Sequence, residues 1–246
     1  MTVQNAIVFA SDSDFCVRTT NLLNMNNPFA VTLWAYPTSW AFYAHFWAAI
    51  VGTQQAGDYV NSDMVGHDPS NPALSRIAAY SGGSGSGPTG AALTLNTWQF
   101  LGLVRESTTS LKLYINGNTT AAITDTQSIS GRGAVGSVLL SRLHGAYGMR
   151  GRIACVKEFS ASKTGTQIAA EKDYWNATDL TNHHETWNFP TGGSRAVGNV
   201  NGYAWTENGT ITDATGPDLA EYGAGGGSPS LLPSNPAAKR NRLLHF

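Results

Sequence analysis

The hydrophobic and polar positions of this chain follow a period of two over many short runs, which end at glycine, asparagine, serine or proline. In SLKLYINGN, residues 110–118, leucine and isoleucine alternate with lysine and tyrosine. This alternation is typical of a β-strand with one buried face, and the Asn116-Gly117 pair after it is the strongest hairpin signal in the chain. Further strands are expected at 5–10, 15–19, 42–52, 74–82, 97–106, 137–143, 151–160, 185–192 and 202–214.

The most aromatic stretch, WAYPTSWAFYAHFWAAIV at 34–51, contains three tryptophans and four other aromatic residues. A membrane-spanning helix needs about 20 mostly apolar residues, but this stretch holds a Pro-Thr-Ser turn signal and His45. We therefore expect no membrane span, and instead two strands joined by a turn, of which the first covers 29–37. In that strand Trp34 and Tyr36 lie on the face opposite to a second apolar set, as in a central strand covered on both faces.

Only one segment, SASKTGTQIAAEKDYWN at 160–176, has a helical pattern. Thr166 is its expected N-cap, and its expected length is about two turns. The Gly/Ser-rich stretch 82–90 is expected to be a flexible loop without packing. About a dozen short strands and one short helix predict an all-β fold, in which two antiparallel sheets pack as a sandwich or jelly roll.

The C-terminal part of the chain changes character after Tyr222. We expect one jelly-roll domain over 1–222, followed by a Gly/Ser/Pro-rich linker and docking tail over 223–246, although 213–222 fits either part. The tail cannot build a core of its own, so it is either a disordered segment or a docking segment. In the docking interpretation its apolar anchors and charges are Leu243, Leu244, Phe246, Arg240 and Arg242.

The composition narrows the class of partner and the location. Charged residues make up 13% of the chain and the net charge is −1, so no strong field attracts nucleic acid or anionic lipid, and neither is expected as a partner. The N-terminal MTVQNAIVFASDSDF lacks the basic and apolar regions of a standard secretory signal, so the protein either stays inside its cell or leaves by another route, such as assembly into a virus particle and lysis. Of these we expect a virion or extracellular location, reached without a standard signal peptide. The two cysteines, Cys16 and Cys155, are either a disulfide between distant strands or two buried thiols.

Four segments in order resemble the laminin G-like members of the concanavalin A-like lectin-glucanase superfamily. They are IVFASDSDFCV, NPFAVTLWAYPTSW, NTWQFLGLVRESTTSLKLYINGN and GRIACVKEFSASKTGTQIAAEKD, and together they cover about 6–176. The resemblance implies a two-sheet jelly roll that serves as a binding or adhesion module. The chain departs from the family pattern at Ala154 and Cys155, where acidic residues are usual.

The family also contains glycosidases and calcium-binding members, but the residues for those chemistries are missing. A glycosidase needs two carboxylates that flank the scissile bond, and the E-x-D-x-E run usual on this fold is absent. GSGSG at 83–87 fits a nucleophile-turn string without the strand and helix that such a turn requires. We therefore expect no enzyme and no catalytic residue.

Metal binding is not expected either. Calcium needs six or more oxygens, which the turn aspartates Asp12, Asp14, Asp63 and Asp68 do not supply, so these are expected to be solvated. Adjacent His183 and His184 would point to opposite faces of a strand, and they and the isolated histidines His45 and His67 are also expected to be solvated. No cofactor is predicted.

The aromatic residues after the Pro-Thr-Ser turn are the remaining candidates for a site. They have three interpretations: core packing, a homo-oligomer interface, or a flat surface that stacks on sugars. In the sugar-stacking interpretation, the ligand-binding residues would be Trp40, Tyr43, Trp47, Asp63, His67 and Asp68.

Together these observations predict a non-catalytic structural or adhesion protein. The first hypothesis is a virus-particle decoration, fibre or tail component that forms a homo-oligomer and contacts other proteins of an assembly. The alternative is a lectin module that recognises a cell-surface glycan, and a glycosidase or lyase on the same fold is the third.

Overall fold

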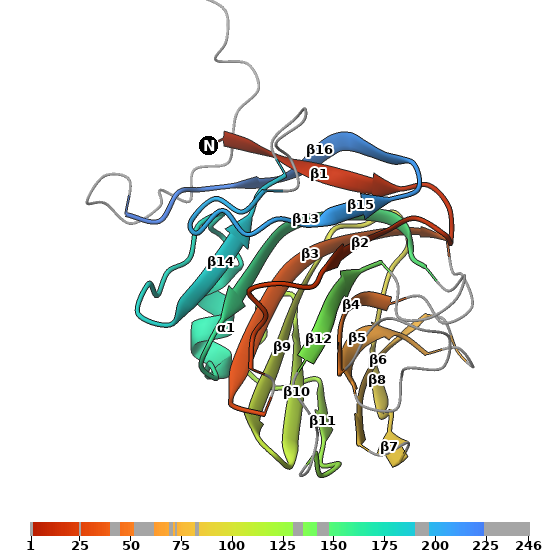
Figure 1. Cartoon of the computed structure of the whole chain (residues 1–246), viewed down its shortest axis with the longest axis vertical. Coiled ribbons are helices and arrows are strands. Elements are labelled where there is room, and N and C mark those ends of the chain that lie inside the picture. Colours follow the sequence, from red (N-terminus) through yellow and green to blue (C-terminus); the bar gives the residue numbers. More distant parts are fainter. Residues whose placement is uncertain are drawn as a thin grey trace, which may run out of the picture.

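Two antiparallel sheets, here sheets A and B, lie face to face in the computed structural model of the chain (Figure 1). Sheet A has the order β11 (Ile123–Asp125), β10 (Ser110–Ile115), β9 (Gln99–Ser107), β3 (Phe29–Ser39), β13 (Arg150–Phe159), β1 (Thr2–Phe9) and β16 (Ile211–Leu219), with β14 (His183–Trp187) also paired to β13. Sheet B has the order β15 (Thr206–Asn208), β2 (Phe15–Arg18), β12 (Val135–Leu140), β4 (His45–Val51), β5 (Ser62–His67), β6 (Leu74–Ser81) and β7 (Ser84–Ser86), with β8 (Thr89–Ala92) also paired to β6. The structure describes residues 2–24, 26–39, 45–51, 62–68, 71, 73–81, 84–129, 135–141, 148–189 and 197–223. The predicted all-β sandwich is confirmed.

Strand β3 is the central strand that its sequence predicts. It lies between β9 and β13, and its residues Phe29, Val31 and Leu33 face sheet B in the main apolar core. The intervening residues Ala30 and Trp34 belong to a second apolar cluster on the outer face of sheet A, the face turned away from sheet B. Both faces are covered because one meets the other sheet and the other meets a helix.

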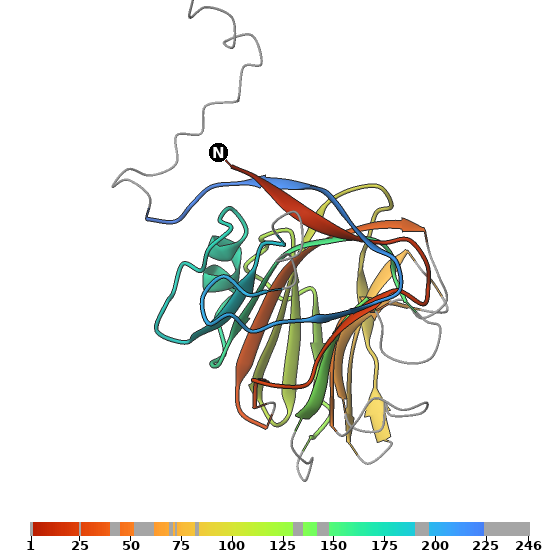
Figure 2. The ribbon, with the colours of Figure 1, turned by 45° about the horizontal axis from the view of Figure 1, so that its top comes forward.

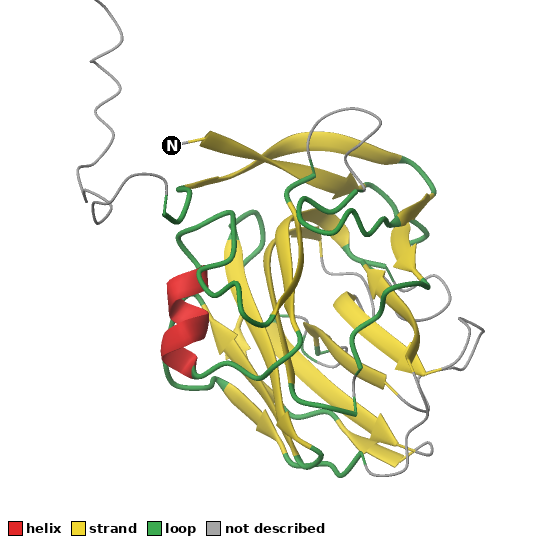
Figure 3. Ribbon diagram, turned by 60° about the vertical axis from the view of Figure 1, so that its left-hand side comes forward, coloured by secondary structure: helices red, strands yellow, loops and turns green. Residues whose placement is uncertain are grey.

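That helix, α1 (Gly165–Glu171), lies against the outer face of sheet A (Figure 3). Its N-cap is Thr164, not the predicted Thr166, because only Thr164 has a glutamine three residues later. The Thr164 hydroxyl accepts the Gln167 backbone N–H at 3.3 Å, and the Gln167 side chain accepts the Thr164 backbone N–H at 2.9 Å. Within the described part of the chain no helix is long and apolar enough to cross a membrane.

Two turn predictions have different outcomes. The β10–β11 hairpin is confirmed, since Asn116 and Gly117 have the positive φ angles of 55° and 79° that such turns need. The prediction of a flexible loop at 82–90 is wrong, because β7 and β8 lie there and pair with β6. Backbone hydrogen bonds to a neighbouring strand do not require large side chains, so a Gly/Ser-rich run can still extend a sheet.

The segment left open in the sequence, 213–222, completes sheet A over most of its length. Strand β16 pairs with β1 from Phe9↔Ile211 to Thr2↔Leu219, and the two strands form a long ribbon at one end of the molecule (Figure 2). The end of β16 therefore lies beside the start of β1.

The two cysteines are both buried free thiols, and burial raises the pKa of Cys155 to about 11.

Sheet A divides in two at Cys155. One edge of β13 pairs with β3, while the other pairs with β1 over 151–154 and with β14 beyond Val156. At the division Cys155 adopts a left-handed φ of 46°, as at a β-bulge, which is unfavourable for a side chain with a Cβ. Its Sγ lies 3.3 Å from the carbonyl oxygen of Trp175, so the segment after α1 fills the fork between β1 and β14.

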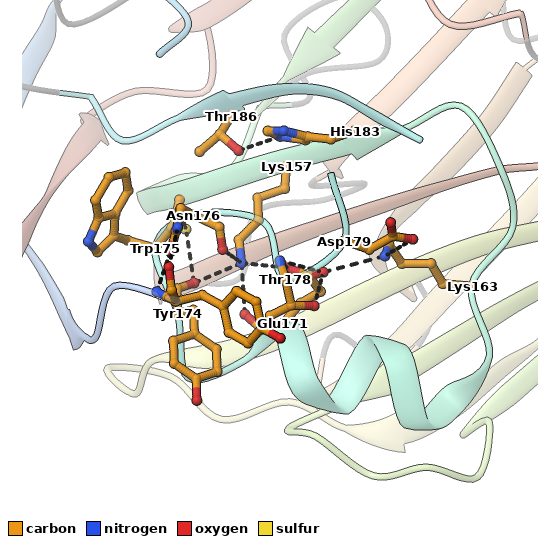
Figure 4. Close-up of polar contacts among 12 residues, drawn as sticks. Lys157, Lys163, Glu171, Tyr174, Trp175, Asn176, Thr178, Asp179, His183 and Thr186 are labelled. Atoms are coloured by element: carbon orange, nitrogen blue, oxygen red, sulfur yellow. Dashed lines mark hydrogen bonds and ion pairs between the residues drawn. The ribbon is translucent and has the colours of Figure 1, made fainter. Parts of the chain in front are cut away.

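Lys157, just beyond the fork, fastens α1 and the segment after it to the sheet (Figure 4). Its buried ammonium lies 2.9 Å from the Glu171 carboxylate and 2.9, 2.7 and 3.1 Å from the carbonyl oxygens of Glu171, Tyr174 and Asn176. These carbonyls lie at or after the last turn of α1, where helical oxygens lack partners and a cation is favourable. One side chain thus neutralises an acid and satisfies three backbone groups.

The Glu171 carboxylate is the other centre of this cluster. It also accepts the Thr178 hydroxyl at 2.6 Å, and Lys163 lies 3.4 Å away. Burial by itself would raise the pKa of Glu171, but the Lys157 charge, the hydrogen bonds from Thr178 and Lys157, and the Lys163 charge together hold it below the ordinary value of 4.5.

Two further buried ion pairs connect the sheets through the core. Arg18 of β2 donates to Glu158 of β13 at 2.5 Å, and Arg105 of β9 pairs with Asp63 of β5. The Arg18 guanidinium also lies over the Trp187 ring at 4.8 Å, so one face of the cation is covered by an aromatic ring. Because an unpaired buried charge is costly, each pair penalises any sliding of one sheet over the other.

Replacing Lys157 by Met is expected to lower the free energy of unfolding by about 3 kcal/mol, since it leaves a buried carboxylate and three carbonyls without their cation. Urea unfolding of the full chain measures this. The matched control is Arg150→Met, which breaks the Arg150–Asp12 pair, whose side chains are 49% and 31% exposed, and should cost less than about 1 kcal/mol. Equal losses in the two variants would contradict the anchoring role of Lys157.

The protein should become less stable as the pH falls, partly because Glu171 takes up a proton. The unfolded carboxyl takes up its proton near 4.5 and the folded one only at lower pH, so the stabilisation is complete above 4.5 and is lost as the pH falls through the folded pKa. Urea unfolding between pH 6 and 3 should therefore give a shallower pH dependence for Glu171→Gln than for the natural chain. Parallel curves would show that Glu171 is not the titrating group.

Candidate functional site

The predicted ligand-binding residues of β4 and β5 face the interior. Trp47 is 0% exposed, and its ring lies 5.9 Å from that of Phe29 in the main core. Asp63 is equally buried and pairs with Arg105 across the sandwich, so the expectation of a solvated turn residue is wrong for it. The register pairs Trp47 with Val65 and Ala49 with Asp63, which places Trp47 and Asp63 on the same core-facing side of sheet B. Core packing is the interpretation of Trp47 that agrees with this placement.

His67 and Asp68 lie together at the end of β5. His67 is 2% exposed, and its Nδ1 lies 3.2 Å from the Asp68 carbonyl oxygen. Asp68 is half-buried and its backbone N–H donates to the Leu74 carbonyl at 2.8 Å. Their role in ligand binding stays a prediction, as does that of the other candidates, which lie outside the described residues: Trp40, Tyr43, Arg240, Arg242, Leu243, Leu244 and Phe246.

The histidines are less exposed than the sequence suggests. His45 is 9% exposed, and His183 and His184 are half-buried. Burial lowers the pKa of His183, whose Nε2 lies 2.7 Å from the Thr186 hydroxyl. The His184 Nε2 lies 2.9 Å from the carbonyl oxygen of Asn21. Among the described residues no group of three or more His, Cys, Asp or Glu side chains is placed to hold a metal ion.

The aspartates of the first turn, which were expected to be solvated, have structural partners. Asp14 is buried and accepts the backbone N–H groups of Ala10, Ser11 and Thr210 at 2.8–3.0 Å. Asp12 holds Arg150 through two hydrogen bonds of 2.8 and 3.1 Å. Both carboxylates fasten the turn to the rest of the chain.

Four other buried carboxylates also have structural partners. Glu185 is 0% exposed, and its two oxygens accept backbone N–H groups from 186, 200, 201 and 203 at 2.7–3.2 Å. Asp63, Glu158 and Glu171 each pair with a buried cation. Each of these carboxylates is thus neutralised or hydrogen-bonded within the folded chain.

The outer face of sheet A carries a different kind of group beyond the part that α1 covers. Tyr36 of β3 and Trp98, which directly precedes β9, are half-buried there with ring centroids 5.3 Å apart. The Arg152 guanidinium of β13 lies 5.0 Å from the centre of the Tyr36 ring. We call Tyr36, Trp98 and Arg152 the outer-face patch.

Side chains point alternately to the two faces of a strand, and the pairing of β9, β3 and β13 brings these three residues together on the outer face of sheet A. Arg152 is directly opposite Tyr36 in the β3–β13 register, and Ala35 is opposite Gln99 in the β3–β9 register, which brings Trp98 beside Tyr36. One row further along the same face, Trp34 and Phe100 are covered as part of the cluster that packs on α1. The patch therefore lies one row beyond the part of this face that α1 covers.

Sequence reasoning placed only one of the three patch residues. It placed Tyr36 on the face opposite to the core residues of its strand, but it looked for the aromatic surface after the turn, around Trp47. Trp98 and Arg152 were missed, because their contact with Tyr36 joins strands that are distant in the sequence. Two adjacent rings and a guanidinium on a flat sheet face can bind a ligand that has both apolar faces and polar edges.

Comparison with known proteins supports this fold assignment. The family model described as the concanavalin A-like lectin/glucanases superfamily, of laminin G type, matches residues 9–169. No curated protein sequence gives a significant match.

Several solved structures share the fold. A heptameric SAP-like pentraxin from Limulus polyphemus is 12% identical with a TM-score of 0.60, over 86% of this chain and 95% of that one. A putative carbohydrate-binding protein from Bacteroides ovatus is 15% identical with a TM-score of 0.61, over 89% of this chain and 62% of that one. The CBM40 domain of Ruminococcus gnavus IT-sialidase, bound to α2,3 sialyllactose, is 13% identical with a TM-score of 0.54, over 70% and 99%.

The four sequence segments that resemble laminin G-like domains, the two-sheet fold and the family match over 9–169 agree with one another. The chain belongs to the concanavalin A-like lectin/glucanase superfamily.

Proposed function

We propose that this protein is a non-catalytic carbohydrate-binding module and that its glycan lies on the outer-face patch. The observation that carries the proposal is the pair of half-buried rings, Tyr36 and Trp98, beside the guanidinium of Arg152. Aromatic rings can stack on the C–H faces of a sugar, while guanidinium, indole and phenol groups donate to its oxygens. Tyr36 lies on β3 and Trp98 directly precedes β9, so the sheet holds both rings and the surface is preorganised.

The similar structures give this proposal general support. One is described as a putative carbohydrate-binding protein, and another is a CBM40 domain bound to sialyllactose. One fold hosts many functions, so the ligand must be argued from the residues of this chain. The outer-face patch supplies the residue types that such a ligand requires.

The absence of catalysis is part of the proposal. Its support is that the buried carboxylates Asp63, Glu158, Glu171 and Glu185 are all engaged by cations or backbone amides. The release of reducing ends from a polysaccharide panel would contradict it.

The virus-particle role, the homo-oligomer and the virion or extracellular location stay predictions from the sequence. For the tail over 223–246 we propose assembly as the role. Its point of exit is fixed, because the Asn176 side chain bonds both backbone groups of Tyr222, at 2.6 and 3.0 Å.

Light scattering tests the tail directly. The full chain is expected to be a defined oligomer and a chain that ends at Tyr222 a monomer, since the apolar anchors lie beyond that residue. The same number of chains per particle in both forms, whether one or several, would contradict an assembly role for the tail.

Glycan binding is tested on a broad glycan array with the labelled full chain, followed by calorimetry with a glycan that binds. Trp98→Ala should weaken binding by about tenfold or more, as expected for an aromatic group at the centre of an interface. The matched control is Tyr222→Ala, which removes an exposed ring that packs on Tyr174 away from the patch and should leave the affinity unchanged. Thermal unfolding confirms that each variant is folded.

Two results would overturn the proposal. An array without any bound glycan would remove the function. A Trp98→Ala variant that binds as tightly as the natural chain would move the site elsewhere.

A further inference from the structure

We propose that the outer-face patch selects sugars that carry a carboxylate, and that Arg152 recognises this group. The inference rests on the proposed function, because it names the ligand class of the same site. It starts from the partners of the arginines.

Arg152 differs from three other arginines that the structure describes. Arg18 pairs with Glu158, Arg105 with Asp63 and Arg150 with Asp12. The Arg152 guanidinium forms no hydrogen bond or ion pair with any described residue, and its cation–π contact is with the Tyr36 ring, whose centre lies 5.0 Å away. An aromatic ring face gives the guanidinium a favourable surface but no acceptor for its five N–H groups.

The cross-strand neighbours of Arg152 on the described strands carry no carboxylate. Across the strands its neighbours in register are Tyr36 on one side and Val8 on the other, and Thr212 lies opposite Val8. Arg152 is half-buried, so part of the guanidinium stays in contact with solvent. The cation is therefore held in place by stacking and has donors left for a ligand.

The nature of those donors indicates the ligand. A guanidinium presents parallel N–H groups that match the two oxygens of a carboxylate, and such charge-assisted pairs are stronger than neutral hydrogen bonds. The rings of Tyr36 and Trp98 beside it would contact the apolar face of the same sugar. The net charge of the chain is −1, so the preference comes from this local arrangement and not from a general attraction of anions.

Calorimetry with two matched ligand pairs tests the inference on the full chain. The first pair is a hexagalacturonate and its methyl ester, which differ in charge, and the second is 3′-sialyllactose and lactose. We expect the carboxylated member of at least one pair to bind about tenfold more tightly than its neutral partner, and added salt to reduce this ratio. A ratio in the galacturonate pair would indicate a uronic acid chain as the ligand, and a ratio in the sialyllactose pair would indicate a terminal sialic acid.

Variants assign the effect to Arg152. R152Q should reduce the ratio to about one while binding of the neutral partner persists, and R152K should restore only part of it, because an ammonium lacks the paired donors. The matched control is R150Q, an arginine two positions away whose guanidinium already pairs with Asp12, and it should leave the ratio unchanged. Unchanged melting temperatures show that the variants are folded.

The failures of the two proposals can be told apart. Equal affinity for the charged and neutral members of both pairs, with binding lost in Trp98→Ala, would overturn carboxylate selection and leave glycan binding in place. A tenfold ratio that survives in R152Q would overturn the role of Arg152. No binding of these ligands or of any glycan on the array would overturn the proposed function itself.

Discussion

The buried ammonium of Lys157 is the interaction on which the arrangement of sheet A depends. Sheet A divides at Cys155, and a divided sheet leaves backbone groups and an apolar face without cover. Lys157 binds the end of α1 and the carbonyls after it, so that this segment fills the fork and α1 covers the adjoining face. A buried lysine is unfavourable without an acid nearby, and Glu171 at the end of the same helix supplies it.

This anchoring also defines the surface that remains open. Because α1 is fixed at the row of Trp34 and Phe100, the next row, with the half-buried Tyr36, Trp98 and Arg152, lies beyond the part of the face that α1 covers. The candidate glycan surface thus follows from the position of a helix that makes no contact with the ligand in this account.

The sequence predicts the fold well and the site only in part, for physical reasons. A period of two is a local signal, so the two faces of β3 and the hairpin at Asn116 follow from the residues themselves. The partner of a buried charge is not local: Asp63 and Arg105 are 42 positions apart, and no local pattern indicates that Asp63 turns inward. Trp98 and Arg152 were missed for the same reason, since only the register of β9, β3 and β13 brings them to Tyr36.

The most direct test of the central claim is to map the bound glycan by nuclear magnetic resonance on isotope-labelled full chain. Titration with a glycan that binds should shift the indole N–H signal of Trp98 and the guanidinium N–H signal of Arg152, while the buried indole of Trp47 stays unchanged. Shifts confined to residues of sheet B, with Trp98 and Arg152 unaffected, would contradict the account.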